Sequence, residues 1–139
     1  MRYRVALGSP ASCSIQHRPR RSSPYSPSAW SQFLRSSQTG QWYWIGNITP
    51  EPTWGTCDPR YPLQIVELDA RTRRLKRATL TVLQDKEPAD DPWVRFSNYR
   101  VYEERGTGDL IVLLRKSYCE FAKPGLPSPG YRYRIKVSP

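Results

Sequence analysis

Arginine and tyrosine are residue types in this chain that could do chemistry, and two of the places where they are adjacent are candidates for a site. Arg60 and Tyr61 lie where a loop enters a predicted strand, and Tyr99 and Arg100 point to opposite faces of another strand. A guanidinium is a planar, permanently charged fork that binds a carboxylate through two parallel hydrogen bonds. Both places are therefore candidate anion-binding sites. The alternative is that Arg60 is a solvated loop residue stacked on Tyr61, that Tyr99 belongs to the core and that Arg100 is a surface residue.

Histidine, cysteine and metal chemistry find little support in the residue counts. The chain has one histidine, His17, which removes histidine-based triads and histidine-rich metal sites. Its three cysteines, Cys13, Cys57 and Cys119, are widely spaced and form no C-x-x-C motif, which argues against a zinc site. Cys57 and Cys119 could form a disulfide, although free buried thiols are the more common state of such cysteines. We expect neither a metal nor a cofactor.

Charge divides the chain into two parts. Its 139 residues suffice for one domain or part of a larger one, and 22 Lys and Arg against 12 Asp and Glu give a net charge of +10. Residues 1–38 hold six arginines and no acid, together with many serines and prolines. Such a segment buries too little apolar surface to offset the entropy lost on ordering. We therefore predict a disordered basic extension at 1–38 and an ordered domain at 39–139.

Three interpretations of residues 1–38 stay open. An acid-free leader rich in Arg and Ser is typical of an organelle transit peptide, and a basic tail is typical of nucleic-acid binding. The third interpretation is an extension without selected structure, produced by a misplaced start or a truncated reading frame. The apolar core of a secretory signal is missing, and no run of apolar residues is long enough to span a membrane. The compartment stays open.

The rest of the chain is patterned as β-strands separated by turns. Residues 131–137 alternate strictly between apolar or aromatic side chains and Arg or Lys, which is typical of a strand with one exposed face. No segment sustains the apolar period of a helix, so the predicted class is all-β. The predicted strands are 41–46, 63–68, 75–83, 94–102, 109–115 and 131–137.

Two of the predicted hairpins share a sequence pattern. Residues 66–75 and 101–110 both match V-x-x-[DE]-x-x-T-x-x-L and stand 35 positions apart. An acid at a strand end accepts hydrogen bonds from the N–H groups of a turn, and a threonine three residues later can cap the same loop. Hairpins that recur at this spacing are typical of β-propeller blades, although two ordinary hairpins could share these residues by chance.

Four segments, taken in order, resemble the C-terminal part of bacterial exo-α-sialidase-like proteins, which belong to the sialidase superfamily of six-bladed, BNR-type β-propellers. The segments are 43–47 (YWIGN), 60–69 (RYPLQIVELD), 96–110 (FSNYRVYEERGTGDL) and 131–135 (YRYRI). The resemblance implies about two antiparallel blades of an incomplete propeller. Two departures stand against it. The Asp-box of the superfamily, S-x-D-x-G-x-x-W, is absent, and ERGTG stands where such proteins tend to carry D-R-E-T-G.

The resemblance also implies a chemistry. Sialidases are glycoside hydrolases that use a tyrosine nucleophile in place of a carboxylate. A glutamate helps to ionise this tyrosine, an aspartate is the acid/base, and three arginines bind the sugar carboxylate. Several blades contribute these groups, so about two blades of roughly 40–50 residues each cannot hold the whole set. We therefore expect a sialidase-like fragment that recognises a sialic-acid-like or other carbohydrate and is inactive alone.

Under this resemblance, four residues are candidate substrate-binding groups, and no residue is assigned as catalytic. Arg60 with Tyr61 would lie at the mouth of the propeller, and Tyr99 or Arg100 would line its central channel.

Aromatic and basic clusters leave further alternatives. Trp42, Trp44 and Trp54 could form a sugar-stacking platform, although buried core aromatics are the commoner explanation. The basic residues between positions 71 and 77 could form a nucleic-acid patch, which the high net charge also favours, or the solvated surface of a hairpin.

A third alternative is an interaction fragment with no chemistry. Two blades taken alone would expose strands that neighbouring blades normally cover. The apolar run at 110–114 would then promote self-association through uncovered blade edges.

Overall fold

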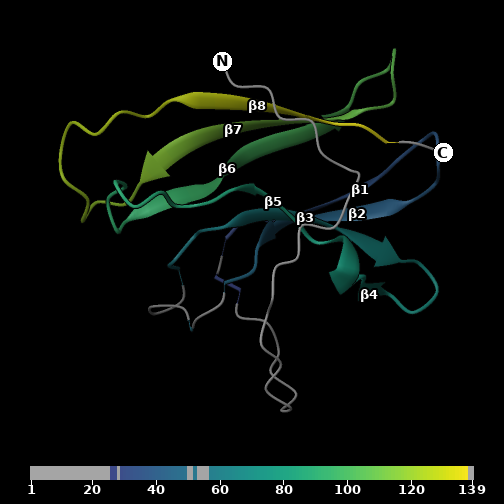
Figure 1. The fold of residues 1–139 in the computed structure, drawn as a ribbon, viewed down its shortest axis with the longest axis horizontal. Helices are drawn as coiled ribbons and strands as arrows, with labels where there is room; N and C mark the ends of the chain where they lie inside the picture. The colour runs from purple at the N-terminus through teal and green to yellow at the C-terminus, as the bar shows by residue number, and fades with distance from the viewer. Residues whose placement is uncertain (1–25, 28, 50–51, 53–56, 138–139) are drawn as a thin grey trace.

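The computed structural model describes residues 26–27, 29–49, 52 and 57–137, and within them the chain is all-β. The strands are antiparallel and alternate with turns, as the sequence pattern predicts (Figure 1). Their bounds are β1 (Gln32–Arg35), β2 (Trp42–Asn47), β3 (Leu63–Asp69), β4 (Arg74–Leu75), β5 (Thr81–Gln84), β6 (Val94–Glu103), β7 (Leu110–Tyr118) and β8 (Gly130–Ile135), with one turn of 3-10 helix, η1 (Arg77–Thr79).

The strands form two sheets, and neither closes on itself. In the first sheet, β1, β2 and β3 lie side by side, and both β4 and β5 pair with β3. In the second sheet, β6, β7 and β8 form a simple meander. Figure 1 shows the two sheets as separate layers, so the fold class is an open, two-layer antiparallel arrangement.

The single strand predicted at 75–83 is wrong, because the structure breaks it into β4, η1 and β5. The hydroxyl of Thr79 explains the break. Its Oγ1 accepts a hydrogen bond from the backbone N–H of Glu67 at 3.0 Å and donates one to the carbonyl of Lys76 at 2.8 Å. The N–H of Glu67 therefore donates to a side chain, whereas in a continuous strand it would donate to a backbone carbonyl.

Part of the segment predicted to be disordered forms a strand. Residues 1–25 and 28 lie outside the described part of the chain, but β1 lies within the segment predicted to be disordered and pairs with β2. Leu34 packs against the core, and Phe33 lies opposite Trp44 across the two strands. An average over a Ser- and Arg-rich segment conceals this short apolar strand, whose order depends on a distant partner.

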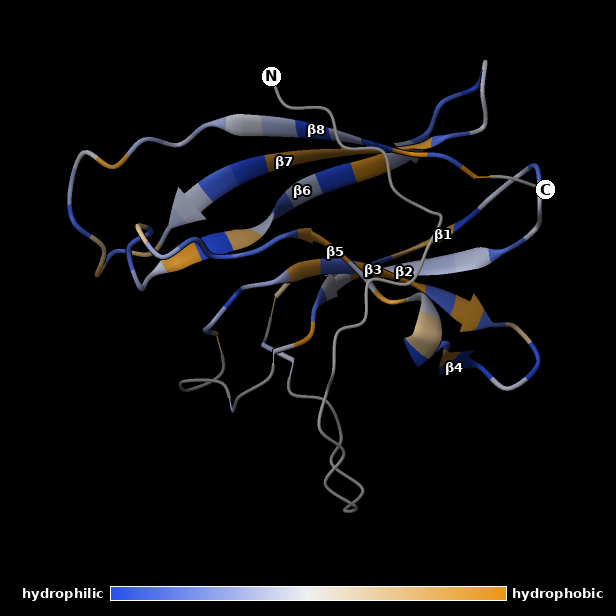
Figure 2. Cartoon of the chain, in the orientation of Figure 1, coloured by the Kyte–Doolittle hydropathy of each residue, from blue (hydrophilic) through white to orange (hydrophobic). Residues whose placement is uncertain are grey.

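The core lies between the inner faces of the two sheets. Phe96 is the largest side chain that is fully buried, and it packs with Ile45, Ile65 and Val112 in one apolar cluster drawn from both sheets. Burial of each such side chain stabilises the fold by about 1.5–3 kcal/mol. In Figure 2, hydrophobic and hydrophilic bands alternate along part of β6, as in a strand with one face on a core, whereas β7 is hydrophobic over residues 110–114 and hydrophilic after them.

Three hairpin turns share one backbone geometry. Gly40, Arg73 and Gly108 have positive φ angles of 71°, 56° and 71°, and each donates its N–H to the carbonyl four residues earlier, at 2.9, 2.7 and 2.8 Å. These carbonyls belong to Ser36, Asp69 and Glu104, which are 33 and then 35 positions apart. A threonine stands three residues after each of them. The repeat predicted for two hairpins therefore has a third member.

The strand pairing beside the turns repeats as well. The residue before each turn pairs with the residue seven positions later. The pairs are Arg35 with Trp42, Leu68 with Leu75, and Glu103 with Leu110. One supersecondary unit therefore occurs three times, twice in the first sheet and once in the second.

The first and third turns contact each other. The backbone N–H and the hydroxyl of Ser37 donate to the carboxylate of Glu103 at 2.9–3.1 Å, and Nε2 of Gln38 donates to the carbonyl of Thr107 at 3.0 Å. Gly108 leaves room for this approach, because a Cβ there would lie 2.1 Å from the Gln38 side chain. These contacts bring turns of the two sheets together at one end of the molecule (Figure 1).

Candidate functional site at the sheet junction

Arg60 lies where the segment before β3 crosses to the second sheet. Its carbonyl accepts a hydrogen bond from the N–H of Phe96 at 2.9 Å, and Arg60 and Arg95 form an isolated parallel bridge. The half-buried guanidinium donates from Nε to the carbonyl of Cys57 at 2.8 Å and from Nη1 to Oγ of Ser97 at 3.4 Å. It has no carboxylate partner among the described residues. Arg60 is therefore a fixed cation at the junction of the two sheets.

A second arginine beside it is neutralised. Arg95 binds both carboxylate oxygens of Asp58, at 2.8 and 2.6 Å, in the bidentate geometry typical of this pair. The hydrogen bond to Asp58 is the main reason that the pKa of Arg95 is raised. Both side chains are mostly buried, with 19% and 10% of their surface exposed. The pair joins the loop before β3 to β6, and sequence patterns gave no sign of it because its members stand far apart in the chain.

Tyr61 and Tyr99 belong to the packing between the sheets. Tyr61 is half-buried against the core cluster, and the ammonium group of Lys86 lies 5.7 Å from the centre of its ring. Tyr99 is buried, and its hydroxyl donates to the carbonyl of Ile45 at 2.8 Å. Burial raises the pKa of Tyr99 above the usual tyrosine value. Tyr99 is therefore a core residue, which was the alternative interpretation of this position in the sequence analysis.

Arg100 lies on the opposite side of β6 from Tyr99. It is exposed on the outer face of the second sheet and makes no hydrogen bond or ion pair with other described residues. The four candidate residues therefore do not converge. Arg60 and Tyr61 lie at the sheet junction, Tyr99 lies in the core, and Arg100 lies on an outer face.

The tryptophans do not form one platform in the described part of the chain. Trp44 is buried and Trp42 is 37% exposed, both on the outer face of the first sheet, while Trp54 lies outside the described residues. The indole of Trp44 lies over Gly46, where a Cβ would come within 2.5 Å of it. Its role is to cover the backbone of β2.

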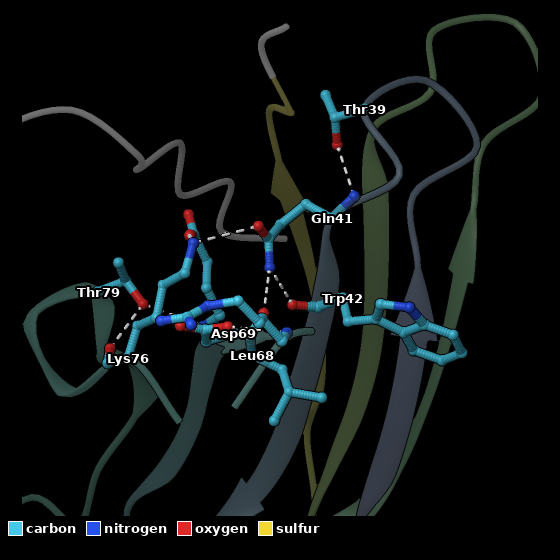
Figure 3. Close-up of polar contacts among 9 residues, drawn as sticks. Thr39, Gln41, Trp42, Leu68, Asp69, Lys76 and Thr79 are labelled. Carbon is cyan, nitrogen blue, oxygen red and sulfur yellow. Dashed lines mark hydrogen bonds and ion pairs between the residues drawn. The ribbon is translucent and has the colours of Figure 1, made fainter. Parts of the chain in front are cut away.

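The basic cluster at residues 71–77 is mostly solvated. Lys76 is the exception, because its Nζ bonds to the carboxylate of Glu67 at 2.9 Å and to Oε1 of Gln41 at 3.2 Å (Figure 3). Nε2 of Gln41 also donates to the carbonyl of Leu68 at 2.7 Å. Lys76 thus helps to tie the first two hairpins together, while the arginines of the cluster are exposed and form no ion pair with described residues.

The described residues form neither a metal-ion site nor a disulfide. They contain no group of three or more His, Cys, Asp and Glu side chains that could hold a metal ion. Cys119 is a buried free cysteine, so the considered bridge to Cys57 does not form. Cys13 and His17 lie outside the described part of the chain.

Helices are nearly absent from this structure, and none in the described residues has the length and hydropathy that a membrane span requires. Comparison of the chain with protein-family models, with curated proteins and with solved structures finds no match.

Proposed function

We propose that this chain is a segment of a sialidase-like β-propeller, equivalent to about two blades, and that it does not cleave glycosides by itself. The observation that carries the proposal is the threefold recurrence of one hairpin turn, twice in the first sheet and once in the second, with a positive φ, the same hydrogen bond and the same flanking pair each time. Recurrence of one hairpin unit at a nearly fixed spacing is typical of propellers.

The outer face of the first sheet supports an assembly with further sheets. We define this apolar outer face by Phe33, Trp42, Trp44, Val66 and Val82, which the strand pairing places on the side away from the core. Phe33, Trp42 and Val82 are 53%, 37% and 43% exposed. Exposed apolar side chains on one face of a sheet are typical of contact surfaces, and a neighbouring blade would cover these three.

The tyrosines account for the expected lack of activity. A sialidase nucleophile must be accessible and must ionise in the reaction. Tyr99 is buried, its hydroxyl is used to bridge the two sheets, and burial raises its pKa. Tyr61 is half-buried against the core. Neither candidate tyrosine is suited to attack a sugar.

Arg60 is the residue we assign to recognition of a sialic-acid-like carboxylate. Its Nε and Nη1 bond to Cys57 and Ser97, which holds the guanidinium in place, and no described carboxylate neutralises it. A guanidinium held in this way can present its remaining N–H groups to a sugar carboxylate. Arg95 cannot serve equally, because Asp58 already occupies its fork.

Two measurements on the whole chain test the proposal. With a fluorogenic sialoside we expect no hydrolysis above the rate without protein. In NMR titration with N-acetylneuraminic acid, we expect resonance shifts centred on Arg60 that an Arg60→Lys variant loses and an Arg105→Lys variant keeps, because Arg60 contacts the beginning of β6 and the exposed Arg105 lies beyond its end. Sialoside turnover by the chain alone would overturn the expected inactivity. Identical titrations of the two variants would overturn the role of Arg60.

A further inference from the structure

The outer face of the second sheet carries arginines on all three strands. Arg100 on β6 lies opposite Leu113 on β7, which lies opposite Arg132 on β8. Arg115 follows two residues along β7, opposite Asn98. Diagonal neighbours in an antiparallel pair are about 7–8 Å apart, so Arg115 lies within reach of the same ligand as Arg100. We call Arg100, Arg115 and Arg132 the arginine face.

Few carboxylates neutralise the arginine face. Arg100 has no partner among the described residues, and Arg115 bonds only to the hydroxyl of Ser128, at 3.1 Å. Arg132 is 3.5 Å from Glu104, whose carboxylate makes its shorter bond to the neighbouring Arg134. The guanidinium groups of Arg100 and Arg115 are therefore available to an external anion.

An open groove of about 490 Å³ continues from the arginine face. The end of β7 and the loop that follows it form its walls, and Arg115 belongs to both the face and the groove. Asn98, Ser117 and Lys123 also line the groove and add hydrogen-bonding groups and a second cation, while Glu120 is its one acid. A flexible anion could therefore run from the sheet into the groove.

Exposed apolar side chains lie among the arginines. Tyr102 is 44% exposed and Leu113 is 42% exposed, both on the outer face of the second sheet. Cationic side chains that hold phosphates, next to an aromatic ring on which a base can stack, are the elements of single-strand nucleic-acid binding. A duplex fits less well, because a flat sheet face offers no helix or ribbon to enter its major groove.

We propose that the arginine face, Tyr102 and the adjoining groove form a binding site for single-stranded nucleic acid. The site is independent of Arg60 and of the sialidase resemblance. Phosphates would lie against Arg100, Arg115 and Arg132, a base would stack on Tyr102, and the strand would continue into the groove past Lys123.

Fluorescence anisotropy of the whole chain with a labelled oligo-dT or oligo-U of about 12 nucleotides tests the site. We expect binding that weakens with salt, with a log–log slope of about −0.7 for each phosphate contacted. Substitution of all three arginines of the face by serine should weaken binding by about tenfold or more and flatten the slope by about 2.

The matched control removes the same charge elsewhere. Serine at Arg71, Arg73 and Arg74, in the second hairpin turn, should leave the affinity within about threefold of the unmodified chain. Equal losses in the two triple variants would overturn the site, because binding would then depend only on net charge. Circular dichroism and thermal melting verify folding, and the single variants Arg100→Ser and Arg115→Ser replace any triple variant that fails to fold.

A variant of Tyr102 distinguishes the contribution of base stacking to binding from that of charge. Tyr102→Ser should weaken binding by about fivefold or more without changing the salt slope, whereas Arg60→Lys should change neither. A competition experiment with other polyanions tests whether the site is specific for a single strand. If duplex DNA, a sulfated oligosaccharide or poly-glutamate displaces the labelled strand at equal phosphate, sulfate or carboxylate concentration, the proposal of a single-strand site is wrong.

Discussion

The two sheets share one core but differ on their outer faces. Outside the first sheet, Trp44 and Val66 are buried and Phe33 and Trp42 are exposed, so the face is apolar. Outside the second sheet, arginines alternate with Tyr102 and Leu113, so the face is cationic. A face of the first kind gains from contact with another apolar surface, whereas a face of the second kind is stable in water or against an anion.

This difference is visible in the strand sequences. The run at 42–45 is aromatic or aliphatic at every position, which is typical of a strand covered on both faces. The run at 131–137 alternates, and β8 has Tyr133 and Ile135 buried between half-exposed arginines. The first pattern is typical of a strand covered on both faces and the second of a strand with one exposed face, while β7 of the second sheet does not alternate over its apolar run at 110–114.

The largest expected effect comes from the core on which both faces depend. Phe96→Ala should lower the free energy of unfolding by about 3–5 kcal/mol, because it leaves a cavity between the sheets. Chemical denaturation followed by tryptophan fluorescence and by circular dichroism measures it. Coincident loss of both signals supports one shared core, and a variant that unfolds only one sheet would separate the two regions.

Adjacent residues on β6 provide the next comparison. Tyr99→Phe should cost about 0.5–1.5 kcal/mol of unfolding free energy, because the buried hydrogen bond from its hydroxyl to the carbonyl of Ile45 is lost. Arg100→Ser, one residue along on the exposed face, should change stability by less than about 0.5 kcal/mol. Denaturant midpoints of the two variants check this, and the opposite ranking would reverse the assignment of the two faces of β6.

The turn glycines test the contact between the sheets at one end of the molecule. Gly40 and Gly108 have the same φ of 71°, so alanine at either position should cost about 1–2 kcal/mol from backbone strain. Gly108→Ala should cost more, because its Cβ would displace Gln38, whereas a Cβ at Gly40 meets only the Arg35 side chain, at 3.3 Å. Equal melting temperatures for the two variants would show that the turn contact does not contribute to stability.

The smallest effect concerns the exposed turn of the second hairpin. The backbone N–H of Thr72, and then that of Arg71, hold the pKa of Asp69 below its usual value of 3.8. Because the folded pKa is the lower one, this stabilisation is present above the unfolded pKa and is lost as the pH falls through the folded pKa. Asp69→Asn should therefore narrow the difference in melting temperature between about pH 6 and about pH 2. An unchanged difference would contradict the role of this carboxylate.

Local patterns predicted the all-β class, most strands and the turns at 69–73 and 103–108. They failed where long-range partners decide the structure. Phe33 and Leu34 form a strand only because β2 lies beside them, and Thr79 breaks the predicted strand at 75–83 because it contacts Glu67. The turn between β1 and β2, which is the additional copy of the repeat, was missed in the sequence because Ser36 stands where the other two turns have an acidic residue.

The candidate site was harder to predict than the fold. Arg60 was a candidate because it stands with Tyr61 at the entry to a predicted strand, and the structure places Arg95 and Ser97 beside it from a strand more than thirty positions away. Tyr99 and Arg100 were predicted to lie on opposite faces of one strand, and the pattern left open which of the two faces the core. Pairing across strands, which no single segment encodes, decides which residues meet.

Sedimentation velocity of the whole chain, with one double variant on each outer face, tests the contrast between the faces most directly. We expect the unmodified chain to self-associate in a concentration-dependent way, Phe33→Ser with Trp42→Ser to shift it to the monomer, and Tyr102→Ser with Leu113→Ser to leave association unchanged. A chain that is monomeric at all concentrations, or a second double variant that dissociates it as fully as the first, would contradict the assignment of the first sheet's outer face as the contact surface.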